Sequence, residues 1–251
     1  MRADLAKFAV FGGEAFAVRG LIFLLTLLSA GLACAAPPPE TARSRAAEAR
    51  VTARLAQEFV AAGLRLGAPV FLRLTKQPAE LELWVEGAGG AFVKFRTYPI
   101  CTFSGALGPK LRVGDGQAPE GFYAVAPGRM NPASSFHLSF DLGYPNAFDR
   151  AHGRTGSALM VHGNCVSIGC YAMGDAAIEE IWTAMAAAYR GGQPFIRVHA
   201  FPFRMDRLGA FRGDPNEAFW ADLKTGWDAF EQTKRPPNTI VRGGRYVIAA
   251  N

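Results

Sequence analysis

Short apolar runs separated by turn residues constrain the fold of this chain more than any other feature. In one of them Leu81, Leu83 and Val85 recur at every second position, and three glycines between residues 87 and 90 follow it. Such alternation is typical of a β-strand with one buried face, and the glycines predict a hairpin to the next run. The predicted strands cover residues 70–74, 81–85, 92–98, 121–125, 135–140 and 195–200.

Amphipathic helices are predicted on both sides of the strands. The first helix runs from about residue 46 to residue 62, after a Pro-rich polar linker over 37–45, and is expected to pack on the outside of the domain. A second helix is predicted over 176–190, with Asp175 as its N-cap and Gly191 as its stop. Strands with flanking helices of this kind indicate a β-rich α+β fold.

The chain divides into four predicted segments. A last helix opens at Asp214-Pro215 and ends at Pro236-Pro237. The predicted segments are a signal peptide (1–36), a linker with an amphipathic helix (37–67), a catalytic domain (68–205) and a C-terminal helical extension (206–251).

The N-terminus resembles an export signal. Arg19 precedes an uncharged apolar run over 20–33, which is shorter than the roughly 20 residues that a membrane-spanning helix needs. The small residues of Ala33-Cys34-Ala35-Ala36 suit cleavage after Ala35 or Ala36, and lipidation of Cys34 is less favoured. We therefore expect a periplasmic protein, with retention of the segment as a membrane anchor as the alternative.

Charge favours anionic partners without indicating a nucleic acid. The chain has 27 Lys and Arg against 21 Asp and Glu, a formal net charge of +6. A basic balance suits anionic lipid, nucleic acid or cell-wall polymer. The basic residues are dispersed and form no run of five or more, so we expect no nucleic-acid binding.

The number of cysteines that follow the predicted signal indicates one free thiol with a function. Removal of the signal leaves Cys101, Cys165 and Cys170, an odd number. An exported protein then keeps at least one free thiol or an intermolecular bridge. An internal Cys101–Cys165 disulfide would leave Cys170 free, but the sequence does not decide the pairing.

His162 and Cys170 are candidates for nucleophilic catalysis. A thiol becomes a strong nucleophile as the thiolate, and a nearby imidazole is the usual general base. The imidazole needs a partner that fixes its tautomer, either a backbone carbonyl or Ser167. Gly169 and the N–H groups of Cys170 and Tyr171 are candidates for an oxyanion hole. The chemistry predicted is acyl transfer.

Two other uses of these residues compete with catalysis. Free cysteines are more often buried structural residues. His152, His162, Cys165 and Cys170 are also possible zinc ligands, but no second ligand pair stands at an ordered spacing. His137 and His199 lie in apolar, strand-like contexts and are expected in the core or a groove. We predict no metal and no cofactor.

The Gly-rich segment 108–123 is interpreted either as a β-turn that leads into a strand or as the wall of a cleft. It lacks the Gly-Lys-[Ser/Thr] ending and the following helix of a nucleotide-binding loop. Lys110 and Arg112 are candidates for binding a substrate carboxylate.

These motifs together resemble the catalytic domain of the L,D-transpeptidase (YkuD) family, in particular its YafK-type branch. The likeness extends over about residues 70–205 and rests on Gly114-Asp115 with Pro119–Tyr123, on Met160–Gly163 and on Ser167–Cys170. It implies a β-sandwich-like fold. It also implies Cys170 as nucleophile, His162 as general base, and Ser167 and Gly169 as residues that shape the nucleophile's turn.

The resemblance further implies a substrate. Members attack the L,D amide next to meso-diaminopimelate in peptidoglycan stem peptides and form a thioester. Lys110, Arg112 and Tyr171 are then the candidate substrate-binding residues. Ile168 replaces the histidine of the common Ser-His-Gly-Cys motif, and Tyr171-Ala172 replaces the usual pair after the cysteine. Such changes are normal in the YafK-type branch, which includes hydrolytic release of a lipoprotein from murein. A non-catalytic peptidoglycan-binding module is the alternative from another class.

Overall fold

A computed structural model describes residues 37–249, and two five-stranded sheets form its centre. The strand order of the first sheet is β3-β2-β1-β10-β5. β1 and β10 are parallel, and every other pair is antiparallel. The predicted hairpin between the second and third runs is therefore confirmed. The strands are β1 (Val70–Gln77), β2 (Glu80–Glu86), β3 (Phe92–Pro99), β5 (Gly121–Val125) and β10 (Ile196–Phe203).

The second sheet is built from short strands in the order β4-β9-β8-β7-β6. Its central pair, β8 and β9, is parallel. The strand predicted over 135–140 begins only at Ser139, because His137 adopts a left-handed backbone conformation (φ 67°) that interrupts an extended chain. The strands are β4 (Thr102–Phe103), β6 (Met130–Asn131), β7 (Ser139–Asp141), β8 (Met160–His162) and β9 (Tyr171–Ala172).

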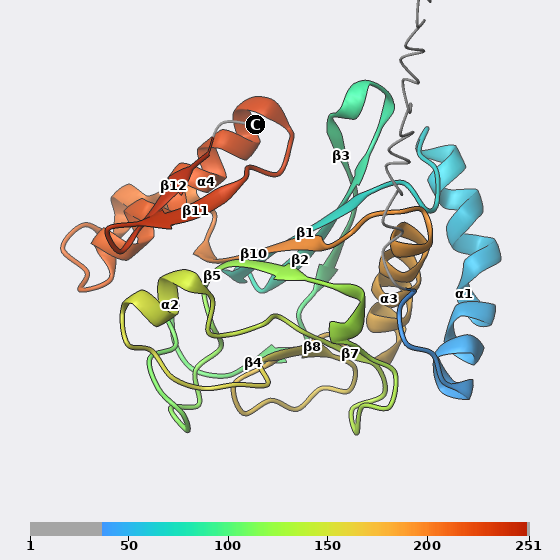
Figure 1. Ribbon diagram of the computed structural model, residues 1–251, viewed down its shortest axis with the longest axis horizontal. Helices are drawn as coiled ribbons and strands as arrows, with labels where there is room; N and C mark the ends of the chain where they lie inside the picture. Colours follow the sequence, from blue (N-terminus) through green and yellow to red (C-terminus); the bar gives the residue numbers. More distant parts are fainter. Residues whose placement is uncertain (1–36, 250–251) are drawn as a thin grey trace, which may run out of the picture. The chain divides into compact units, whose positions relative to one another are not determined.

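The main hydrophobic core lies between the two sheets (Figure 1). Leu72 of β1 and Val198 of β10 contribute from the first sheet, and Phe140 of β7 and Val161 of β8 contribute from the second. All four side chains are fully buried. The predicted β-sandwich-like α+β fold is confirmed in this arrangement, since each sheet buries one face against the other.

Helices α1 (Ala42–Ala61) and α3 (Asp175–Arg190) pack against each other beside the sheets (Figure 1). The first helix begins four residues earlier than expected, because Thr41 and Ser44 form a reciprocal capping box. The linker of 37–45 is correspondingly shorter. Asp175 is not the N-cap of α3; Gly174 takes that position and Asp175 is the first helical residue. Its carboxylate instead accepts a hydrogen bond from the Asn164 N–H.

The C-terminal part covers the outer face of the first sheet. Helix α4 (Glu217–Thr233) packs Trp220 and Trp227 against Phe203 and Phe201 of β10, with ring centroids 5.2 and 5.0 Å apart. The prediction of a purely helical extension is incomplete, because a hairpin of β11 (Thr239–Arg242) and β12 (Arg245–Ile248) follows. Its two-residue turn is a Gly-Gly pair with both φ angles positive, which favours glycine at both positions.

Short helical turns complete the described elements. They are η1 (Ala88–Gly90), η2 (Pro127–Arg129), α2 (Ala147–Ala151) and η3 (Met205–Phe211). Across residues 37–249, no helix combines the length and the apolar character needed to cross a membrane. The predicted signal peptide and Cys34 lie outside the described residues.

Candidate functional site

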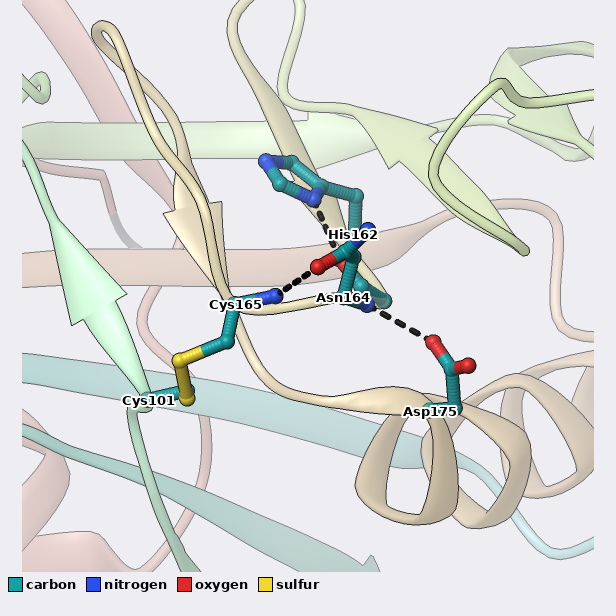
Figure 2. The surroundings of a disulfide bond; sticks show 6 residues. Cys101, His162, Asn164, Cys165 and Asp175 are labelled. Carbon is teal, nitrogen blue, oxygen red and sulfur yellow. Dashed lines mark hydrogen bonds between the residues drawn. A yellow bond between two sulfur atoms is a disulfide. The ribbon is translucent and has the colours of Figure 1, made fainter.

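Cys101 and Cys165 form a disulfide, and Cys170 is the free cysteine of the described residues. Figure 2 shows this disulfide joining the segment before β4 to the loop between β8 and β9. The pairing that the sequence leaves open is thereby decided. The loop that it fastens carries the predicted motif from His162 to Cys170.

Strand pairing brings the segments of His162 and Cys170 side by side in the second sheet. Val161 of β8 pairs with Tyr171 of β9, and both side chains lie in the core. Because side chains alternate along a strand, His162 projects from the opposite face of β8, and Cys170 directly precedes β9. Within the described residues no hydrogen bond joins the imidazole to the thiol. Instead the Met160 N–H donates to Cys170 Sγ over 3.3 Å.

The imidazole of His162 is held in one tautomer. Its Nδ1 lies 2.6 Å from the carbonyl oxygen of Gly163, which can only accept a hydrogen bond. Nδ1 therefore carries the proton and Nε2 keeps its lone pair. Of the two partners that the sequence leaves open, a backbone carbonyl is the one observed. The ring of Phe136 packs on the imidazole, with centroids 4.8 Å apart.

Burial keeps both groups neutral near pH 7. It lowers the pKa of His162, and it raises the pKa of the Cys170 thiol above its ordinary value. A neutral imidazole with a free Nε2 is competent as a general base. The resting state is therefore a neutral thiol and a neutral imidazole rather than a thiolate–imidazolium pair.

Ser167 organises the turn at Cys170. Its hydroxyl oxygen accepts the N–H groups of Gly169 (3.3 Å) and Cys170 (3.0 Å), and the hydroxyl donates to the Cys170 carbonyl over 2.8 Å. Gly169 has a φ of 129°, a conformation that side chains rarely adopt. The Cys170 N–H that sequence reasoning assigns to an oxyanion hole is thus bonded to Ser167 in this structure.

Ser104 is a site residue that sequence reasoning missed. Its hydroxyl donates to Ser167 Oγ over 2.9 Å, so it supports the turn from the loop after β4. The two serines are 63 residues apart, and no local pattern connects them. The pairing of β4 with β9 and the Cys101–Cys165 disulfide bring their segments together.

The loop between His162 and Cys170 is braced at its start by α3. The Asn164 N–H donates to Asp175 Oδ1 over 2.7 Å, and the Asn164 side chain accepts the Cys165 N–H over 2.6 Å (Figure 2). The Gly174 N–H in turn donates to the Asn164 carbonyl over 2.8 Å. Asp175 therefore holds the loop to the helix, and the disulfide holds it to β4.

The predicted cleft wall, residues 108–123, contains Lys110, which forms an ion pair, and Arg112, which is exposed. Lys110 is buried and lies 2.5 Å from Asp115. Burial opposes ionisation of Asp115, but hydrogen bonds from the Arg112 backbone N–H, the Lys110 ammonium and other backbone N–H groups outweigh it and lower the pKa of Asp115 to about 2. Arg112 is exposed and pairs with no acid in the part of the chain described. Tyr171 is fully buried, and its hydroxyl donates to the Pro119 carbonyl over 2.7 Å.

A buried ion pair joins this wall to the C-terminal helix. Lys76 Nζ lies 2.9 Å from Glu120 Oε1, and neither side chain is exposed. The same carboxylate accepts the Gly108 N–H over 2.7 Å and the Trp220 indole N–H over 2.9 Å. Sequence reasoning missed this cluster, because its members come from β1, the cleft wall and α4.

The four candidate zinc ligands do not form a metal site. The Cys165 sulfur is committed to the disulfide, and no group of three potential ligands occurs in residues 37–249. His199 is buried between Phe71 and Phe122, as expected for a core residue. His137 Nε2 lies 2.8 Å from a carboxylate oxygen of Glu179.

Comparison with known proteins identifies the class. No family model matches the chain. A curated relative, "Putative L,D-transpeptidase YafK" of Escherichia coli K12, is 44% identical over 186 residues, which cover 73% of this chain and 75% of the relative. The E. coli O157:H7 protein of the same name matches equally. The chain belongs to the L,D-transpeptidase family. Within it, the predicted YafK-type branch is confirmed.

Two solved structures from Campylobacter jejuni are also similar. Both are of the helical cell shape determining protein Pgp2. The K307A mutant is 22% identical, with a TM-score of 0.44 over 64% of this chain and 56% of that one. The other is 17% identical, with a TM-score of 0.42 over 74% of this chain and 79% of that one.

Proposed function

We propose that this protein is an exported cysteine acyltransferase that acts on diaminopimelate-linked amides of peptidoglycan stem peptides. The observation that carries the proposal is the state of Cys170. It is the free thiol of the described residues, and it lies in a turn beside the strand that presents a tautomer-fixed imidazole. The family membership supports the substrate class.

The reaction proceeds in two steps. In the first, His162 Nε2 takes the thiol proton while Cys170 Sγ attacks the amide carbonyl carbon. The C–N bond then breaks, the leaving amine takes the proton from the imidazolium, and a thioester remains. In the second step an amine or water gives its proton to His162 and attacks the thioester, and the thiol is restored.

The neighbouring residues have distinct roles in this proposal. Gly169 gives the nucleophile's turn its backbone conformation, and Ser167 orients the turn through two hydrogen bonds with Cys170 and one with Gly169. Arg112, exposed on the cleft wall, is the better placed of the two predicted cations to meet a substrate carboxylate. Lys110 holds the wall through Asp115. Tyr171 is fully buried, so it supports the wall through its hydrogen bond to the Pro119 carbonyl and is not proposed to bind substrate.

The disulfide supports an extracytoplasmic location. Structural disulfides persist in oxidising compartments such as the periplasm and are rare in the cytosol. The Cys101–Cys165 bond and the predicted signal over residues 1–36 therefore favour export.

The test is product analysis with defined substrates. Purified protein is incubated with muropeptides and with lipoprotein-linked peptidoglycan, and the products are read by mass spectrometry. Crosslinked products indicate an amine acceptor, and released peptide or lipoprotein indicates water. Cys170→Ala should abolish both kinds of product while keeping the wild-type melting temperature. Turnover by Cys170→Ala at the wild-type rate would refute the mechanism.

A carbapenem probe separates the enzyme from a binding module. An activated thiol should form a mass adduct at Cys170, and Cys170→Ala should form none. Binding to sacculi without any adduct or product would instead favour a non-catalytic peptidoglycan-binding module.

A further inference from the structure

A pocket of about 370 Å³ away from Cys170 is lined by three arginines. Arg129 comes from η2, Arg150 from α2 and Arg197 from β10, and Asn238 and Thr239 complete one wall at the start of β11. Among its described lining residues none is acidic. Neither Cys170 nor His162 is among these lining residues, so the pocket is distinct from the thiol site.

Arg197 is the cation at the inner side of the pocket. It is half-buried on β10, opposite Ala124 of β5, and forms no ion pair with any described residue. Burial alone lowers the pKa of its guanidinium, with no acid nearby to oppose the effect. His199, two residues along the strand, is buried and its pKa is lowered well below the ordinary value, so it stays neutral and adds no second positive charge. A half-buried cation without a counter-ion is costly unless a ligand supplies one.

The other two arginines also keep donors for a ligand. Arg150 donates to the Pro145 carbonyl and pairs with no acid in the described chain. Arg129 lies 3.5 Å from Asp141, and its guanidinium packs so closely over Gly143 that an added Cβ there would lie 3.0 Å from Cζ. The guanidinium forks present far more N–H donors than these contacts use.

We propose that this pocket binds an oxyanion, a carboxylate or phosphate group of a small ligand. Guanidinium groups match both of these planar or tetrahedral acceptors bidentately. The Asn238 amide and the Thr239 hydroxyl add neutral hydrogen-bonding groups at one wall. The pocket also gives the C-terminal hairpin a binding role, since Thr239 of β11 and the preceding Asn238 line the pocket.

The experiment measures anion binding by the full chain with isothermal titration calorimetry at constant ionic strength. The probes are inorganic phosphate and citrate, with chloride as the reference anion. Wild-type protein should bind at least one of the two probes. Arg197→Gln and the more exposed Arg150→Gln should each weaken binding about tenfold or more, the loss expected for a charge-assisted hydrogen bond.

Matched controls make each outcome decisive. Arg212→Gln removes the same charge from an exposed site outside the pocket and should bind as wild type. Cys170→Ala should also bind as wild type, which separates this proposal from the acyl-transfer function. Preference for phosphate or for citrate would identify the ligand's acidic group. Absence of binding to both probes, or equal loss in Arg150→Gln and Arg212→Gln, would overturn the proposal.

Discussion

Removal of the Cys101–Cys165 disulfide should destabilise the protein strongly. The two cysteines are 64 residues apart, and crosslinking a loop of that length removes about 14 cal/mol/K of chain entropy from the unfolded state. At room temperature this corresponds to about 4 kcal/mol of stability. For a protein of this size, the double variant Cys101→Ser/Cys165→Ser should therefore melt roughly 8–16 °C below the wild type.

Calorimetry or circular dichroism of the oxidised proteins checks this value. The double variant is preferable to either single one, because a lone remaining thiol could form intermolecular bridges. Cys170→Ser is the matched control, since it alters a cysteine and leaves the disulfide intact. Hydrogen exchange should also increase across residues 163–169, which the disulfide fastens to the segment before β4. A double variant that melts within 2 °C of the control, roughly the shift expected from 0.5–1 kcal/mol, would refute the reasoning.

Three further predictions concern the site and its supports. Because burial lowers the pKa of His162, the acid limb of kcat/KM should fall below pH 6.5, and a limb above that pH would argue against His162 as the base. Ser104→Ala should lower kcat several-fold with little change in KM, since it removes only the bond that orients Ser167; equal kcat in steady-state assays would contradict this role. Lys76→Met leaves the Glu120 carboxylate buried without its partner and should cost about 3–5 kcal/mol, measured by urea denaturation, whereas a loss below about 1 kcal/mol would mean that the buried ion pair contributes little to stability.

Local patterns predicted the elements that depend on neighbouring residues. The alternation of Leu81, Leu83 and Val85 predicted β2, and Gly191 as a stop predicted the end of α3 at Arg190. The errors are local as well. Asp175 suits an N-cap by residue type, but its carboxylate bonds to Asn164 instead. The Gly-Gly turn at 243–244 was a readable hairpin signal that the helical prediction overlooked.

The candidate site divides in the same way. The motif around Cys170 is contiguous, so spacing and residue type were enough to name Cys170 and His162 as candidates and to predict the turn between Ser167 and Cys170. The tautomer partner of His162 was left open, because a backbone carbonyl has no sequence signature. The burial of Lys110 against Asp115 could be seen only in the folded structure, since a charged residue is expected to be exposed when the sequence alone is considered.

The sequence by itself determined the class of the protein, because a short contiguous motif carries the family likeness that the 44% identity to a curated relative shows. Only the tertiary structure decided which cysteines pair, that Ser104 supports Ser167, and that Arg129, Arg150 and Arg197 line one pocket. The physical reason is distance along the chain. These residues come from strands and helices that meet only when the sheets form, and no local periodicity records which distant segments will be neighbours.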